Sequence, residues 1–122
     1  RIQAYTFDGD LEFSWGEFSN GIEGFCGCCN PVSFALLPGG GYITAEKGLT
    51  RVKEYDADGK FVGVVAAPKE FPDHAGACSL TEPLACITKG LDVAVDSKGR
   101  VLVVDPIAGN VRIFAKIETG SG

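Results

Sequence analysis

An all-β fold is predicted for this chain by three observations: repeated strand-like segments, regular turn signals between them, and the lack of helical periodicity. Residues 32–55 overlay residues 91–114 without a gap, and residues 1–13 match residues 51–63. No window shows a long apolar stripe at helical spacing, so helix should be scarce. Repeats of this kind indicate stacked supersecondary units, each of which buries its apolar face against its neighbours.

Each repeat predicts short strands divided by turns. In the middle of the chain the strand-like runs are VSFALL, YITAE, RVKEY and FVGVVA, and the later copy supplies LDVAV, RVLVVD and VRIF. The turns are expected to use Asp bonded to its own backbone and Gly at positive φ, as in Asp8-Gly9, Asp58-Gly59 and Asp96-x-x-Gly99. Four short strands at close, regular spacing fit one blade of a β-propeller.

The last repeat, GLDVAVDSKGRVLVVDPIAGNVRIF, resembles the NHL repeat. Its blades read as an apolar run, Asp-x-x-Gly, a second apolar run ending in Asp, and an aliphatic run closing on Phe. The segment VKEYDADGKFVGVV resembles the outer half of the same blade. Residues 32–55 are the weaker match, because Pro38-Gly39-Gly40 stands where the repeat usually has an Asp-bearing turn. The resemblance implies an NHL-like β-propeller, which closes with about six blades when complete.

The chain is too short for a complete propeller of this kind. Residues 1–116 are therefore expected to form an arc of one. We expect residues 1–16 to form the outer strands of one blade, 32–66 a complete blade, and 91–116 the inner strands of the next, with 117–122 a tail or linker. An open arc exposes strand edges and unpacked blade faces. The expected partners are therefore the remaining blades of a longer chain, or other protein subunits.

Composition and charge restrict the function classes. The chain of 122 residues carries a net charge of −5 and no basic run, which argues against nucleic acid as the main partner. No apolar stretch approaches the ~20 residues of a membrane span, and the first residues lack a signal-peptide pattern. These features favour a globular β protein whose cellular location stays open.

Two connections between the repeats carry all the cysteines: residues 17–31, the first connection, and residues 67–90, the second connection. The cysteines are Cys26, Cys28 and Cys29 in the first, and Cys78 and Cys86 in the second. In a propeller such a connection crosses one face from the rim to the axis. The two groups should therefore arrive at equivalent places on neighbouring blades, which predicts a common cysteine site on that face.

Three interpretations of the cysteines remain open. In the first, thiolates from both connections hold an iron–sulfur cluster; zinc fits less well because the two connections do not each supply a C-x(2–4)-C pair. An iron–sulfur centre would relay electrons to a redox partner. In the second, no cofactor is bound and disulfides staple the connections, which favours a periplasmic or secreted protein. The third is a catalytic thiol site, for which His74 would be the only histidine base.

The remaining polar and aromatic candidates are expected to be structural. His74 is read first as a solvent-facing loop residue and second as an extra metal ligand. Glu46 and Asp105 end equivalent strands and are weak candidates for an axial calcium site. Trp15 and Phe18 are expected to cover a blade edge rather than stack on a ligand. A basic set on or beside the third strands is read as a solvated face; it consists of Lys47, Arg51, Lys53 and Arg112.

The sequence therefore predicts a non-catalytic propeller scaffold that presents a cysteine cluster on one face. The alternative is a disulfide-stapled binding or assembly module. A propeller enzyme of lactonase or lyase type comes third, since this arc supplies no axial cluster of acidic residues or histidines.

Overall fold

The computed structural model describes residues 1–19, 21–25, 30–74 and 90–116. This part of the chain contains strands and two short 3₁₀ helices but no α-helix, which confirms the prediction of an all-β fold. The elements are β1 (Ile2–Tyr5), β2 (Leu11–Trp15), β3 (Ser33–Leu36), β4 (Tyr42–Glu46), β5 (Arg51–Tyr55), β6 (Phe61–Ala66), η1 (Pro68–Glu70), η2 (Pro72–His74), β7 (Asp92–Val95), β8 (Val101–Asp105) and β9 (Asn110–Phe114). Within these residues, no helix is long and apolar enough to cross a membrane.

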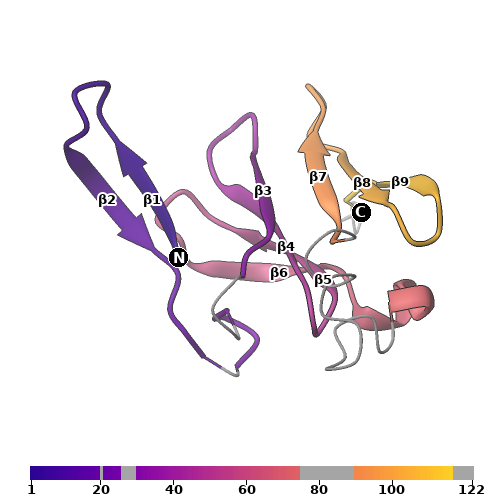
Figure 1. Ribbon diagram of the computed structural model, residues 1–122. Helices are drawn as coiled ribbons and strands as arrows, with labels where there is room; N and C mark the ends of the chain where they lie inside the picture. Colours follow the sequence, from indigo (N-terminus) through magenta and orange to yellow (C-terminus); the bar gives the residue numbers. More distant parts are fainter. Residues whose placement is uncertain (20, 26–29, 75–89, 117–122) are drawn as a thin grey trace, which may run out of the picture.

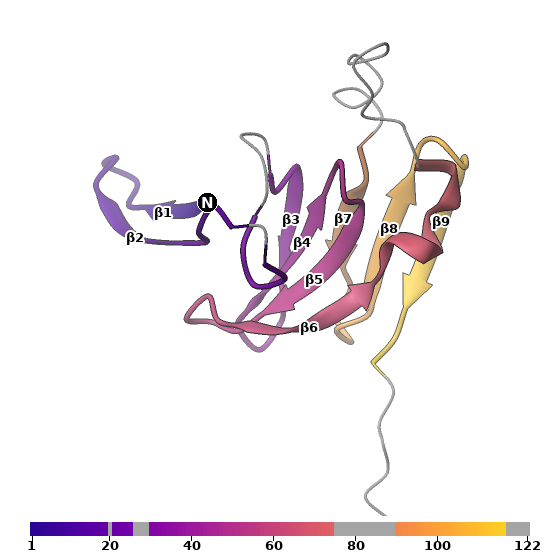
Figure 2. The ribbon, with the colours of Figure 1, turned by 90° about the horizontal axis from the view of Figure 1, so that it is seen from below.

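The strands form three antiparallel sheets, each built only from strands that follow one another in the chain. The first sheet is the hairpin β1–β2, the middle sheet has the order β3-β4-β5-β6, and the last sheet has the order β7-β8-β9. Figure 1 shows the sheets following one another across the molecule, and Figure 2 shows the hairpin projecting from one end. Short turns explain this order, because they allow only consecutive strands to pair.

Strand register repeats from sheet to sheet. Ser33 pairs with Ala45 in the middle sheet, while Asp92 and Val104, each 59 positions later, pair in the last sheet. The first sheet matches the outer half of the middle sheet, since Tyr5 pairs with Leu11 as Tyr55 pairs with Phe61. Residues at equivalent positions can therefore be compared directly.

Two hydrophobic clusters join the sheets. The larger joins the middle and last sheets through buried aliphatic residues such as Val52 and Val103, with Phe71 from the second connection. The smaller joins the first and middle sheets and is mainly aromatic: Trp15 lies 4.6 Å from Tyr55 between ring centroids. Trp15 is thus a core residue between two sheets, whereas Phe18 is exposed.

The turns follow the predicted chemistry with one correction. Gly59 and Gly99 take positive φ, and the Asp96 carboxylate accepts hydrogen bonds from the N–H groups of Lys98 and Arg100. In the turn between β5 and β6, however, the accepting carboxylate belongs to Asp56, not Asp58. The preference is geometric, because the first residue of the turn has its side chain over the N–H groups that follow.

Candidate functional site

A buried ionic cluster lies where β4 ends. The Glu46 carboxylate accepts hydrogen bonds from Arg51 Nε at 2.6 Å and Nη2 at 3.2 Å, and Lys53 Nζ lies 3.1 Å away. All three residues are buried, and the Lys53 side chain is 0 % exposed. The prediction that Arg51 and Lys53 belong to a solvated face is therefore wrong. Their strand lies inside the stack of sheets, where a charge is tolerated only when paired.

Lys53 also holds the first connection against the middle sheet. Its ammonium group donates hydrogen bonds of 2.8 Å to the backbone carbonyls of Ile22 and Gly24. With Glu46 these account for all three of its N–H donors. The same nitrogen lies 4.8 Å from the ring centroid of Phe25, a buried residue of that connection. We call Glu46, Lys53 and Phe25 the first anchor.

A second buried polar cluster occupies the equivalent place in the last sheet, where β8 ends. Asp105 lies 59 positions after Glu46, and its Oδ1 lies 2.7 Å from His74 Nε2. The same oxygen accepts hydrogen bonds from the backbone N–H groups of Ile107 and Ala108. His74 is buried, so its expected exposure in a loop is wrong. The short helix η2 turns its ring inward onto the carboxylate.

Arg112 lies 59 positions after Lys53, and it holds the second connection as Lys53 holds the first. Its Nη2 lies 3.6 Å from Asp105 Oδ2, and its Nη1 donates to the backbone carbonyl of Glu70. Its guanidinium carbon lies 5.1 Å from the ring centroid of Phe71, which is buried like Phe25. We call Asp105, Arg112 and Phe71 the second anchor. Each anchor therefore joins an acid, a base and a phenylalanine, although the Arg112 side chain is 27 % exposed and lies farther from its acid than Lys53 does.

Burial and pairing shift the pKa values of these groups. Burial lowers the pKa of Lys53, although Glu46 acts in the opposite direction. Burial raises the pKa of Tyr55, whose hydroxyl donates to the Glu23 carbonyl. For Asp105, burial alone would raise the pKa. The hydrogen bonds from Ala108, His74 and Ile107 outweigh that effect, and its pKa lies below the usual value.

The two connections are also fixed where they enter their sheets. The Asn30 side chain accepts a hydrogen bond from the Lys47 N–H and donates one to the Lys47 carbonyl. The hydroxyl of Ser33, at the start of β3, hydrogen-bonds to the carboxylate of Asp92, at the start of β7. The entry points of the two connections thus lie side by side.

The five predicted cysteine ligands, Cys26, Cys28, Cys29, Cys78 and Cys86, lie outside the described residues. Of the other predicted site residues, His74 and Asp105 are brought together, while Glu46 belongs to the separate cluster in the middle sheet. In the described ranges, no three His, Cys, Asp or Glu side chains form a group that could hold a metal ion.

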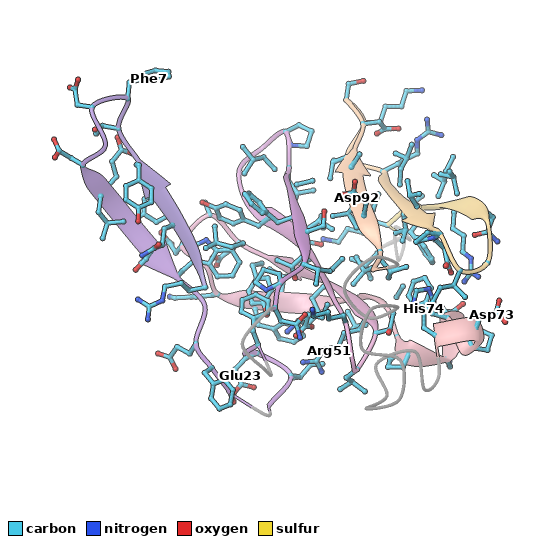
Figure 3. All side chains as sticks on the ribbon, in the orientation of Figure 1. Phe7, Glu23, Arg51, Asp73, His74 and Asp92 are labelled. Carbon is cyan, nitrogen blue, oxygen red and sulfur yellow. The ribbon has the colours of Figure 1, made fainter. Side chains whose placement is uncertain are left out.

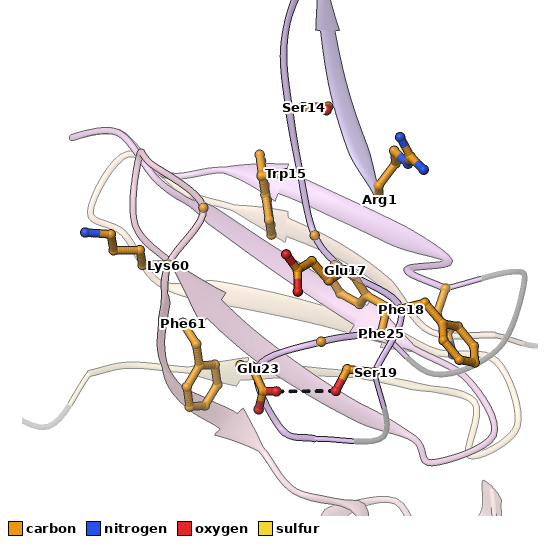
Figure 4. A pocket seen from close by; sticks show the side chains of 14 residues that line it. Arg1, Ser14, Trp15, Glu17, Phe18, Ser19, Glu23, Phe25, Lys60 and Phe61 are labelled. Atoms are coloured by element: carbon orange, nitrogen blue, oxygen red, sulfur yellow. Dashed lines mark hydrogen bonds between the residues drawn. The ribbon is translucent and has the colours of Figure 1, made fainter.

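An open cleft of about 860 Å³ lies beside the first anchor, between the hairpin and the middle sheet. Figure 4 shows Trp15, Phe25 and Phe61 along it, with the Glu23 carboxylate bonded to the Ser19 hydroxyl. The acidic residues at its rim, Glu17 and Glu23, are exposed. The cleft is therefore an open, aromatic-sided site with exposed acidic residues, next to the first connection.

Sequence reasoning missed Phe25 and Phe71. The connections differ in length, so their phenylalanines do not align. A usable signal was nevertheless present: the pairs Glu46 and Lys53, and Asp105 and Arg112, keep charge and spacing in both repeats. An acid and a base retained at inward strand positions indicate a buried pair rather than a solvated face.

Acid sensitivity should follow from Asp105. Its folded pKa lies below the unfolded value of about 3.9, so its contribution to stability is complete above that value and is lost as pH falls through the folded pKa. We expect urea unfolding of Asp105→Asn to show a shallower loss of stability between about pH 5 and pH 2 than the wild-type chain. The exposed Asp58→Asn should keep the wild-type slope, and equal slopes for all three proteins would contradict the assignment.

Comparison with known proteins finds no family model that matches the chain and no curated protein with significant similarity. Function must therefore be argued from the residues and their arrangement.

Proposed function

We propose that this chain is an arc of an NHL-like β-propeller, a non-catalytic scaffold whose two connections form one cysteine cluster. We further propose that the cluster holds an iron–sulfur centre and acts as a one-electron carrier. It would accept an electron from a reduced partner protein and pass it to an oxidised one. Thiolate sulfur from about four cysteines is the ligand set that such centres use, and the two connections together carry five.

The observation that carries the proposal is that both connections are held to their sheets at residues beside the cysteines. Phe25, which directly precedes Cys26, is held by Lys53, and Asn30, which directly follows Cys29, is held by the backbone of Lys47. The three-cysteine segment is therefore bracketed by two fixed residues. Fixed residues on both sides of the cysteines suit a redox centre. Ligands that move little when the oxidation state changes keep the barrier to electron transfer low.

The second connection supports the same reasoning. His74, held by Asp105, precedes Cys78 by four positions, and the buried Leu91 follows Cys86 by five. Leu91 leads into β7, which lies beside β3 through the bond between Ser33 and Asp92. Only short stretches of chain separate the cysteines from these fixed residues. Both cysteine groups could therefore meet in one site above the adjacent strands β3 and β7.

The test is the metal content and thiol state of the purified chain. Prepared without oxygen, the protein should show visible absorbance and bound iron with acid-labile sulfide. Serine replacement of any true ligand should remove the colour, and at least four of the five single cysteine variants should do so. Ser97→Ala, in an exposed turn of the last sheet, should keep the full absorbance as a matched control.

Two outcomes would overturn the iron–sulfur proposal. A colourless protein with one free thiol per chain would indicate two disulfides and hence a stapled scaffold. A colourless protein with five free thiols would have neither a cluster nor disulfides, and only the proposal of a scaffold would remain. Mapping disulfides by peptide analysis would show, in the first case, whether they join the two connections.

A further inference from the structure

The open cleft between the hairpin and the middle sheet has walls that belong to segments inside the chain. They are the end of β2, the first connection and the turn that leads into β6, and Arg1 adds to one side. The Trp15 ring lies so close to this turn that a Cβ atom at Gly59 would come within 2.5 Å of its Cγ atom. Phe25 of the connection packs on the same ring, with 6.0 Å between ring centroids. Contacts between these segments therefore set the shape of the cleft.

Most of the negative charge of the chain lies in the hairpin and the first connection. Residues 1–25 contain five acidic residues and one basic residue, a net charge of −4, while the whole chain carries −5. The five acidic residues are all exposed: Asp8, Asp10, Glu12, Glu17 and Glu23. Figure 3 shows Glu23 at the outer border of the molecule. A surface of one charge sign attracts partners of the opposite sign and raises their rate of association.

Two of these carboxylates, those of Glu17 and Glu23, lie among the aromatic rings of the cleft (Figure 4). Glu23 accepts a hydrogen bond from the Ser19 hydroxyl at 3.3 Å, and neither carboxylate forms an ion pair with a described residue. The same figure shows the charged ends of Arg1 and Lys60 turned away to either side. The middle of the cleft is therefore acidic and aromatic.

The first anchor shows how this combination of groups holds a cation. Lys53 Nζ lies 3.1 Å from the Glu46 carboxylate and 4.8 Å from the ring centroid of Phe25. In the cleft the rings of Phe18 and Phe61 stand beside carboxylates in the same way, and Phe18 is 77 % exposed. A cation from outside the chain would thus meet an ion pair and a cation–π contact together.

A buried polar group beside the cleft favours a peptide as the carrier of that cation. Trp15 Nε1 is buried and has no hydrogen-bond acceptor among the described residues, and its ring lines the cleft. An unpaired buried donor is costly and calls for an acceptor. A peptide brings backbone carbonyl oxygens along with its basic side chains, whereas a protonated polyamine brings donors alone.

We propose that the cleft binds a basic segment of a partner protein, with a lysine or arginine side chain held between Glu17, Glu23 and the ring of Phe18. The acidic hairpin steers the segment toward the cleft. Phe25 and Asn30, which directly flank the three-cysteine segment, both line the cleft, so the partner docks beside those cysteines. Binding uses carboxylates and rings, so it does not depend on what the cysteines hold.

The test measures binding of a labelled, N-acetylated tetralysine amide to the purified chain by fluorescence anisotropy at about 0.15 M salt. We expect saturable binding with one peptide per chain, and the same affinity for protein prepared with and without oxygen. Glu17→Gln combined with Glu23→Gln should raise the dissociation constant about tenfold. Asp8→Asn combined with Glu12→Gln removes the same charge outside the cleft, and should raise it by less than about threefold.

A second pair of variants tests the aromatic contact. Phe18→Leu keeps an apolar side chain but removes the ring, and should weaken binding about threefold. Phe13→Leu makes the same change at an exposed ring of β2 outside the cleft, and should bind the peptide like the wild-type chain. The substituted positions are all exposed, so the variants should fold, which circular dichroism would verify.

Three results would overturn the proposal. The first is a wild-type chain that does not bind the peptide saturably. The second is an equal loss of affinity in the two pairs of charge variants, which would indicate attraction by net charge without a site. The third is spermine, which carries the same number of positive charges, binding as tightly as the peptide; the cleft would then be a polyamine site.

Discussion

Glu46→Gln should lower the free energy of unfolding by about 3–5 kcal/mol, because it leaves buried cations without their counter-ion. Glu46 is the partner of both Arg51 and Lys53, and none of the three side chains has appreciable contact with water. A glutamine of the same shape removes the negative charge and turns an N–H group toward one of the cations. Urea unfolding followed by circular dichroism would measure the loss.

Matched variants separate charge from packing at this position. Glu54→Gln removes a carboxylate from an ion pair whose lysine is largely exposed, so its effect should be about 1 kcal/mol or less. Combining Glu46→Gln with Lys53→Met should recover part of the lost stability, because the buried ammonium is then absent. Equal effects of Glu46→Gln and Glu54→Gln would contradict a buried ionic cluster. The double variant also gives a measurement if the single variant fails to fold.

Phe25→Ala should cost about 3–5 kcal/mol, the range for removing a large buried aromatic side chain. Phe25 is buried between Trp15, 6.0 Å away between ring centroids, and Tyr55, 5.6 Å away. It also lies under the ammonium group of Lys53. Removing the ring would leave a cavity in the small cluster that joins the first and middle sheets, and would release the first connection.

Phe18→Ala is the control for Phe25→Ala, since the two residues form a backbone bridge in the same connection. Phe18 is exposed, so its replacement should change stability by no more than about 0.5 kcal/mol. Limited proteolysis would add a local measurement. Phe25→Ala should be cleaved faster within residues 17–31, the first connection, while the three sheets stay protected. Similar stability losses for both variants would show that the ring of Phe25 does not hold the connection.

The strands and their order could be predicted from sequence because the information is local. Alternating apolar runs such as RVLVVD, separated by Gly- and Asp-bearing turns, specify short strands, and short turns permit only consecutive strands to pair. The repeat also predicted register, and the equivalence of Ser33 with Asp92 is seen directly in the structure. These features depend on near neighbours in the chain.

The burial of the charged residues depended on contacts that no local pattern records. Lys53 lies on a strand of mixed charge, RVKEY, which reads as half-solvated, yet the connection folds over it and supplies two carbonyl acceptors. His74 lies in a Pro-rich segment that reads as exposed, yet Asp105 draws it inward from 31 positions away. A lone charge at such positions would be too costly to bury, and only the partner brought by the tertiary fold makes it stable. The sequence by itself thus determined the sheets, and the packing of the connections on them decided the anchors.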